Sequence, residues 1–178
     1  MDATPLPGSP GAVEQPVSDV RVELYAGSRD TLRPLFELAE DSAVQLDSYL
    51  ADGRVLVALS GGEVIGHLQL VDSRPADFEI KNMAVRETHQ GRGVGRSLVR
   101  AAIELAASGA GATLRVATAA ADVGNLRFYQ RQGFRMRAID RDAFTPGTGY
   151  PQRIVIDGIP LRDRVWLDYD LGTDTAER

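Results

Sequence analysis

The feature that most constrains this chain is a glycine-rich turn between an apolar strand pattern and a helical pattern. The turn reads Gln90-Gly91-Arg92-Gly93-Val94-Gly95, with a glycine at every second position. Residues 78–85 before it predict a strand, and apolar residues at helical spacing after it predict a helix that stops near Gly109. A strand that passes through such a turn directly into a helix predicts an α/β domain.

The chemistry that suits this turn is the binding of an anion. Glycine removes the Cβ atom where the backbone must approach a ligand closely. The first helical turn leaves its N–H groups without partners, and the helix dipole favours negative charge at that end. Together these features predict a pyrophosphate cradle, to which Arg92 and Arg96 can add charge-assisted hydrogen bonds. The glycines alone are equally consistent with a plain connection between a strand and a helix.

Other common phosphate motifs do not fit the turn. The dinucleotide pattern G-x-G-x-x-G fails because Arg96 or Leu98 stands where its third glycine belongs. The P-loop pattern fails because no Gly-Lys-Ser/Thr follows, and the kinase pattern fails because no kinase catalytic loop appears downstream.

The remaining patterns predict a mixed sheet with helices on both faces. Residues 54–60 and 63–71 flank Gly61-Gly62 and predict a hairpin, and a second hairpin is expected at Asp157-Gly158. Leu32, Leu35, Phe36 and Ala39 predict one helix, and Leu46, Tyr49 and Leu50 predict another. We therefore expect about seven strands; the others fall near residues 20–24, 78–85, 112–118, 165–171 and from 134 onward.

Length and composition favour a single domain. The chain has 178 residues, 43% of them hydrophobic, which is enough for one sizeable core. We predict a domain over residues 19–171, between a disordered tail at 1–18 and a polar tail at 172–178. No cysteine is present, so disulfides and thiolate chemistry are excluded, and no metal site is expected.

Charge and targeting signals exclude several classes of protein. The chain carries 20 Lys and Arg against 25 Asp and Glu, a net charge of −5, which argues against a nucleic-acid partner. No apolar run reaches the roughly 18 residues of a membrane span, and residues 1–18 do not resemble a secretory signal. We therefore expect no membrane partner and a cytoplasmic location.

A second motif gives the chain a family resemblance. Asn125-Leu126-Arg127-Phe128-Tyr129-Gln130-Arg131-Gln132-Gly133-Phe134 follows the turn after one intervening strand. The turn resembles the GNAT superfamily pattern Gln/Arg-x-x-Gly-x-Gly/Ala, and this second segment resembles the family's Asn-x-x-x-Tyr-x-x-x-Gly-Phe. The ordered pair resembles GNAT acetyltransferases, and stretches such as residues 79–85 and 138–144 are most similar to the YvbK-like branch of small bacterial members.

The resemblance implies a binding mode for acetyl-CoA. The cofactor arm would lie where the fourth and fifth strands part, paired with the backbone at Met83, Ala84 and Val85. The amides of residues 91–96 would hold the pyrophosphate, and Asn125 would bind near the pantetheine. The cofactor-binding residues implied are Met83, Ala84, Val85, Gln90, Gly91, Arg92, Gly93, Val94, Gly95, Arg96, Asn125 and Tyr129.

The resemblance also implies catalytic residues. Tyr129 is four residues after Asn125, on the same helical face, and would protonate the leaving thiolate; its alternative is a core tyrosine. Glu79 would be the base through a water molecule, although a surface glutamate paired with Lys81, or a water chain with no dedicated base, fits as well. Strand alternation places Glu79 on the face of Met83 and Val85 unless a bulge intervenes.

The acceptor stays open at this level. We expect a small-molecule or peptide amine, and the acidic balance leans towards a cationic small molecule. Tyr49 and Tyr150 could wall its pocket, and Asp140, Asp142 and Asp163 either line it or are plain surface acids. Homodimers are common for this fold, but no interface signature is visible. The competing function is a non-catalytic acyl-CoA sensor or interaction module.

Overall fold

The computed structural model describes residues 20–74 and 76–172. The predicted tails lie outside these residues apart from Gly172, so the predicted tail boundaries stay predictions. Within the described part of the chain, no helix is long and apolar enough to cross a membrane.

The core of the domain is a seven-stranded mixed sheet in the order β1-β2-β3-β4-β5-β9-β6. Neighbouring strands are antiparallel except for β4 and β5, which run parallel. This confirms the predicted mixed sheet. The strands are β1 Arg21–Leu24, β2 Arg54–Ser60, β3 Glu63–Arg74, β4 Asp77–Val85, β5 Thr113–Ala119, β6 Arg135–Asp140 and β9 Arg164–Asp170.

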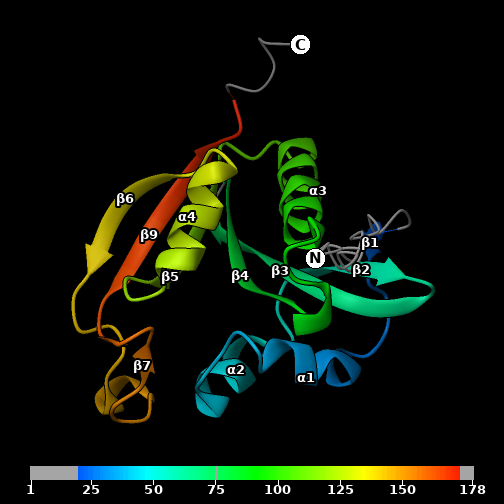
Figure 1. Cartoon of the computed structure of the whole chain (residues 1–178). Coiled ribbons are helices and arrows are strands. Elements are labelled where there is room, and N and C mark those ends of the chain that lie inside the picture. The colour runs from blue at the N-terminus through cyan, green and yellow to red at the C-terminus, as the bar shows by residue number, and fades with distance from the viewer. Residues whose placement is uncertain (1–19, 75, 173–178) are drawn as a thin grey trace, which may run out of the picture.

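Two pairs of helices accompany this sheet. They are α1 Arg33–Phe36, α2 Ala43–Tyr49, α3 Val94–Ser108 and α4 Val123–Arg131. The Ser42 side chain caps α2 by accepting from the Gln45 amide, and the Asp122 side chain caps α4 by accepting from the Asn125 amide. Figure 1 shows α3 and α4 in front of the sheet, with α1 and α2 at its lower end.

The first helix is shorter than the sequence predicts. A 3-10 turn over Arg29–Leu32 leads into a single α-helical turn that ends at Phe36. Leu32, Leu35 and Phe36 are buried, but Ala39 is exposed. Pro34 is compatible only with the first turn, and the next apolar residues, Leu38 and Ala39, are both exposed, so the buried stripe ends at Phe36.

Buried side chains form two clusters, one on each face of the sheet. The larger, which we call the α3 cluster, contains Leu98 and Ala102 of α3 and Tyr129 of α4, packed on β2 to β5 and β9. The smaller contains Phe36 and Leu46 of the first two helices, packed on β2. Helices therefore cover both faces, as the sequence predicts.

The long segment between β6 and β9 contains the predicted second hairpin. Strands β7 Val155–Ile156 and β8 Ile159–Pro160 pair across Asp157 and Gly158, which both have positive φ angles. The Gln45 side chain of α2 donates to the carbonyl of Thr148 at 3.0 Å. The segment is therefore tied to α2, beside the sheet face that α3 and α4 leave uncovered.

Candidate active site

The site begins where β4 and β5 stop pairing. Their parallel register runs only from Asp77–Thr113 to Ile80–Val116. Beyond this point β4 continues to Val85 and β5 to Ala119 with no further pairing between them in the described part of the chain. A cleft of about 1140 Å³ is lined by both strands here. This is the parting of the two strands that the family resemblance implies.

A β-bulge in β4 sets which side chains face each side of the sheet. Ile80 pairs with Leu70 and Asn82 with Gln69, so Lys81 is the extra residue. Phe78 and Ile80 belong to the α3 cluster before the bulge, and Met83 and Val85 pack against that cluster after it. Glu79 therefore does not share a face with Met83 and Val85.

The glycine turn leaves backbone donors free at the start of α3. Gly91 and Gly93 have φ angles of 72° and 84°, and a Cβ atom on either would meet no heavy atom within 4 Å. In the described part of the chain, no hydrogen bond satisfies the backbone amides of residues 91–96. The turn therefore combines open space with orphan donors at a helix N-terminus, which is what a diphosphate requires.

Two residues of the turn that line the cleft also have structural roles. A Cβ atom on Gly95 would lie 3.3 Å from the Phe128 ring, so this glycine allows α3 to approach α4 closely. The Gln90 side chain donates to the Val85 carbonyl at 3.0 Å and holds the turn against β4.

The two arginines of the turn differ in position. Arg96 lines the cleft, whereas Arg92 is exposed and is not among the lining residues. Neither forms an ion pair with another described residue. Of the two, Arg96 is the one that forms part of the cleft lining, and the role of Arg92 stays a prediction.

Helix α4 brings Asn125 and Tyr129 to the same cleft. The Asn125 side chain donates to Asp122 Oδ2 at 2.7 Å, which leaves its carbonyl oxygen available. Tyr129 is 5% exposed and packs edge-on against Phe128 and Phe134. Burial, with a smaller contribution from Asp122, raises the pKa of the Tyr129 hydroxyl, which makes no hydrogen bond to a described residue.

The opposite part of the cleft, which we call the acceptor half, carries charged and aromatic groups. It is lined by Glu40, Asp41, Tyr49, Glu79, Lys81, Phe144, Tyr150, Arg164 and Trp166, among others. Lys81 Nζ lies 3.3 Å from Glu79 Oε1 and 5.2 Å from the centre of the Tyr49 ring. Glu79 thus lies inside the cleft, as a base would, and is also paired with Lys81, as a surface glutamate would be. Each of the two expectations for Glu79 matches part of its environment.

A hydrogen-bonded chain runs from the acceptor half into the core. The Tyr49 hydroxyl donates to Glu40 Oε2 at 3.2 Å and accepts from Asn82 Nδ2 at 2.9 Å. Asn82 Oδ1 lies 2.9 Å from His67 Nε2. Because Asn82 uses its amide hydrogens on Tyr49 and the Phe36 carbonyl, its oxygen accepts from the imidazole.

The imidazole of His67 and the phenols of Tyr49 and Tyr150 are neutral near pH 7. His67 is fully buried against the Phe36 ring, and burial lowers its pKa to about 4. Burial raises the pKa of the Tyr49 hydroxyl. Tyr150 has its pKa raised to about 12, mainly by burial and then by Glu40. The imidazole of His67 and the hydroxyl of Tyr49 therefore keep the same hydrogen-bonding roles around neutral pH.

Sequence reasoning missed Glu40 and Asn82 and left open whether the acids of the C-terminal segment line the pocket. Glu40 lies in a polar loop between two helices, where nothing in the sequence distinguishes it from Asp41. Asp140, Asp142 and Asp163 do not line the cleft. Asp140 accepts from the Trp166 indole, and Asp163 accepts from the Asp142 amide, so these acids are surface groups that order their own segment.

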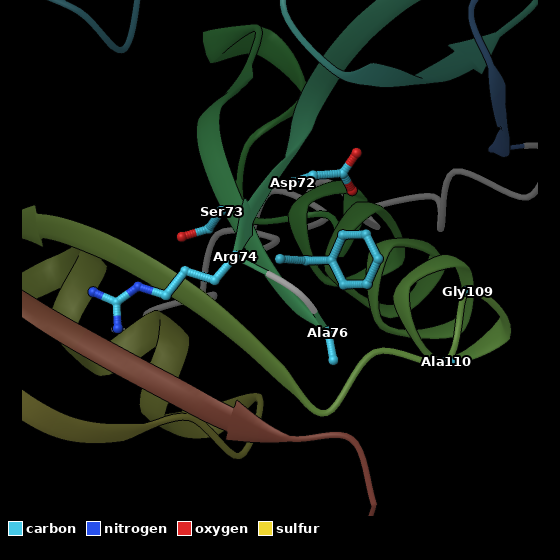
Figure 2. Close-up of a pocket in the computed structure, with 7 residues that line it drawn as sticks. Asp72, Ser73, Arg74, Ala76, Gly109 and Ala110 are labelled. Atoms are coloured by element: carbon cyan, nitrogen blue, oxygen red, sulfur yellow. The ribbon is translucent and has the colours of Figure 1, made fainter.

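A second, shallower pocket of about 440 Å³ lies at the far end of β4. Figure 2 shows the side chains of Asp72 and Arg74 pointing away from each other there. No convergent set of polar groups forms, and the glycine turn does not contribute to this pocket.

Comparisons with known proteins agree with this geometry. The sequence matches the Acetyltransferase (GNAT) family over residues 23–134. It is 38% identical over 152 residues to the uncharacterized N-acetyltransferase YvbK of Bacillus subtilis strain 168, covering 85% of this chain and 97% of that protein. The predicted similarity to this branch is thereby confirmed.

Solved structures extend the comparison to coenzyme A complexes. A Bacillus subtilis acetyltransferase in complex with CoA is 38% identical with a TM-score of 0.79, covering 85% of this chain and 99% of that one. A GNAT family acetyltransferase from Elizabethkingia anophelis with acetyl-CoA bound is 29% identical with a TM-score of 0.80, covering 86% and 99%. An IAA acetyltransferase from Bacillus cereus is 36% identical with a TM-score of 0.78, covering 85% and 99%.

The glycine turn yields a first prediction. Gly93→Asp should weaken acetyl-CoA binding by about 100-fold or more, because a carboxylate would occupy the open space over the orphan amides. Gly61→Asp is the matched control, since Gly61 also has a positive φ and an open Cβ position but lies in the β2–β3 hairpin. Isothermal titration measures both; equal affinities in the two variants would contradict the assignment.

The buried histidine yields a second prediction. In the unfolded chain His67 becomes protonated below about pH 6.5, whereas in the folded protein it becomes protonated only near pH 4. The contribution of His67 to the free energy of unfolding is therefore fully present above pH 6.5 and is lost as the pH falls towards 4. Between pH 7 and pH 4.5, the unfolding free energy of the wild type should fall by about 2 kcal/mol more than that of His67→Gln, measured by urea denaturation. Parallel pH profiles would show that the folded protein protonates His67 as easily as the unfolded chain does.

Proposed function

The chain belongs to the GNAT family of acetyltransferases, and from that premise we propose that it transfers the acetyl group of acetyl-CoA to a primary amine by direct attack in a ternary complex. The observation that carries the proposal is the cleft at the parting of β4 and β5, because orphan amides, an unpartnered phenol and acidic side chains all line it. Acetyl-CoA supplies the acetyl group in activated form, as a thioester.

The donor half of the cleft fits coenzyme A. The free amides of residues 91–96 and the Arg96 guanidinium would hold the diphosphate. The backbone of Met83–Val85, which has no β5 partner in the described part of the chain, would pair with the pantetheine arm. The Asn125 carbonyl oxygen would accept from a pantetheine amide.

The acceptor half supplies the conditions for attack. The acceptor nitrogen must be neutral when it attacks the thioester carbon, and Glu79 would take its proton through a water molecule. The ion pair with Lys81 uses Glu79 Oε1, which leaves the other carboxylate oxygen for that water. A backbone amide near Val85 would stabilise the oxyanion.

Tyr129 is suited to the final proton transfer. As the new N–C bond forms and the C–S bond breaks, the sulfur departs as a thiolate and takes the phenolic proton. The raised pKa keeps Tyr129 protonated at neutral pH, so the donor form is present before the reaction. After the N–C bond has formed, the nitrogen loses its second proton to water, and the phenol regains a proton from solvent. An ammonium acceptor and acetyl-CoA therefore give an amide, free CoA and one released proton.

The competing function is a non-catalytic acyl-CoA-binding module. It would need the glycine turn but not the unpartnered Tyr129 or the carboxylates of the acceptor half. A thiol-release assay over a panel of amines, run beside acetyl-CoA titration, separates the two. Tight binding without turnover on any amine would favour the module.

The acid role gives a third prediction. Tyr129→Phe should lower kcat by about 10- to 100-fold while changing the acetyl-CoA Kd less than about threefold, because only the proton donor is removed. Tyr25→Phe is the control, since Tyr25 is a tyrosine outside the cleft. An unchanged kcat in Tyr129→Phe would remove Tyr129 from this role.

The base role gives a fourth prediction. Glu79→Gln should lower kcat/KM by about 100-fold near neutral pH and recover in part at higher pH, where more of the amine is already neutral. Glu63→Gln is the control, because Glu63 pairs with Arg86 on the surface outside the cleft. A pH–rate profile that is the same for Glu79→Gln and wild type would exclude Glu79 as the base.

A further inference from the structure

Arg164 is a cation of the acceptor half that the proposed chemistry does not use. It is the first residue of β9, in register with Ala119 of β5 on one side and Asp140 of β6 on the other. The next residue, Val165, belongs to the α3 cluster, so Arg164 lies on the opposite face of the sheet. Its side chain lines the cleft.

Aromatic rings hold this guanidinium in place. Its central carbon lies 5.1 Å from the centre of the Phe144 ring and 6.0 Å from that of Trp166. Arginine packed on aromatic rings keeps its N–H donors available at the edge of the guanidinium plane. The chain therefore fixes the position of the cation without using up its hydrogen-bonding capacity.

No carboxylate neutralises Arg164 within the described residues. It takes part in none of the ion pairs there, although Asp140 is its neighbour across the strands. The Asp140 carboxylate accepts instead from the Trp166 indole at 2.7 Å. The other cation of the acceptor half, Lys81, is paired with Glu79.

Glu40 provides the opposite charge in the same half of the cleft. Glu40, Tyr150 and Arg164 all line the cleft, and the two charged groups act in opposite directions on the pKa of the Tyr150 hydroxyl, which Glu40 raises and Arg164 lowers. An ammonium group would be attracted to Glu40 and an anionic group to Arg164. The acceptor half is therefore bipolar, and a purely cationic acceptor would leave Arg164 without a counterion.

The geometry points to an amino-carboxylate as the acceptor: we propose that Arg164 binds the carboxylate of an amino acid or a close relative whose amine receives the acetyl group. A single planar guanidinium matches a carboxylate in a two-point hydrogen-bonded pair, whereas a phosphate group is commonly met by several donors. This inference rests on the proposed acetyl transfer and names the substrate class for it.

The experiment compares each common amino acid with its carboxamide, in which the negative charge is absent. Wild type, Arg164→Gln and the control Arg162→Gln are assayed for thiol release, and kcat/KM is determined for each pair. Arg162 is 70% exposed, lies 3.6 Å from Asp142 and does not line the cleft. The wild type should favour the best amino acid over its amide by about 100-fold. Arg164→Gln should reduce this ratio to near one, chiefly through KM, while Arg162→Gln keeps it.

Two results would overturn the proposal. One is a wild type that acetylates the amides or decarboxylated amines at least as well as the amino acids. The other is an Arg164→Gln variant that still discriminates like the wild type, which would mean that Arg164 only packs against the rings. Arg164→Lys serves as a further variant, because it keeps the charge but loses the planar two-point pair and should restore only part of the ratio.

A binding measurement separates failure of this inference from failure of the proposed function. Amino acids and their amides are titrated calorimetrically into the protein saturated with CoA, where no transfer occurs. Binding of an amino acid that Arg164→Gln loses and Arg162→Gln retains supports the inference even if no amine is acetylated. Absence of amino-acid binding to the wild type, or equal binding of acid and amide, overturns it.

Discussion

The parting of β4 from β5 after Ile80 is the constraint on which the rest of the structure depends. Two parallel strands that stop pairing expose backbone from both, and a sheet tolerates this only where another group replaces the lost partner. The bulge at Lys81 lies just beyond the last pair and rotates the following residues of β4. Residues on both faces of the sheet therefore line one continuous cleft between the separated strands.

Different structural features position the groups in each half of the cleft. On the donor side, positive φ angles at Gly91 and Gly93 aim the start of α3 at the opening, and Gly95 lets α4 approach until Tyr129 reaches it. On the acceptor side, the chain from Glu40 through Tyr49 and Asn82 to a neutral His67 fixes the polar groups before any ligand arrives. A preorganised polar site avoids rearrangement during the reaction.

The sequence predicted the fold well because its strongest signals are local. The Gly61-Gly62 hairpin, the Asp157-Gly158 hairpin and the strand–turn–helix unit each depend on a few adjacent residues, and all are present. The residues that the family resemblance implied for the cofactor side include Asn125 and Tyr129, which share one helical face and both line the cleft. Their catalytic and binding roles stay predictions.

The acceptor side was only partly accessible because it is assembled from distant segments. Tyr49 and Tyr150 were expected at this pocket and line the cleft. Glu40, Asn82 and Arg164 come from three separate parts of the chain, and none has a distinctive neighbour in sequence. The bulge at Lys81 has no glycine or proline to mark it. The early end of α1 at Phe36 depends on which residues the sheet can bury, which is decided only after the sheet has formed.

The central claim is that the free amides of residues 91–96 bind the diphosphate of coenzyme A. Amide chemical shifts measured by NMR during a CoA titration test it most directly. Pantetheine, which has the arm of CoA but no phosphate, is the comparison ligand. The account predicts large downfield shifts for these amides with CoA but not with pantetheine, and no change at Gly61 and Gly62. Saturable CoA binding that leaves the amides of residues 91–96 unmoved would contradict it.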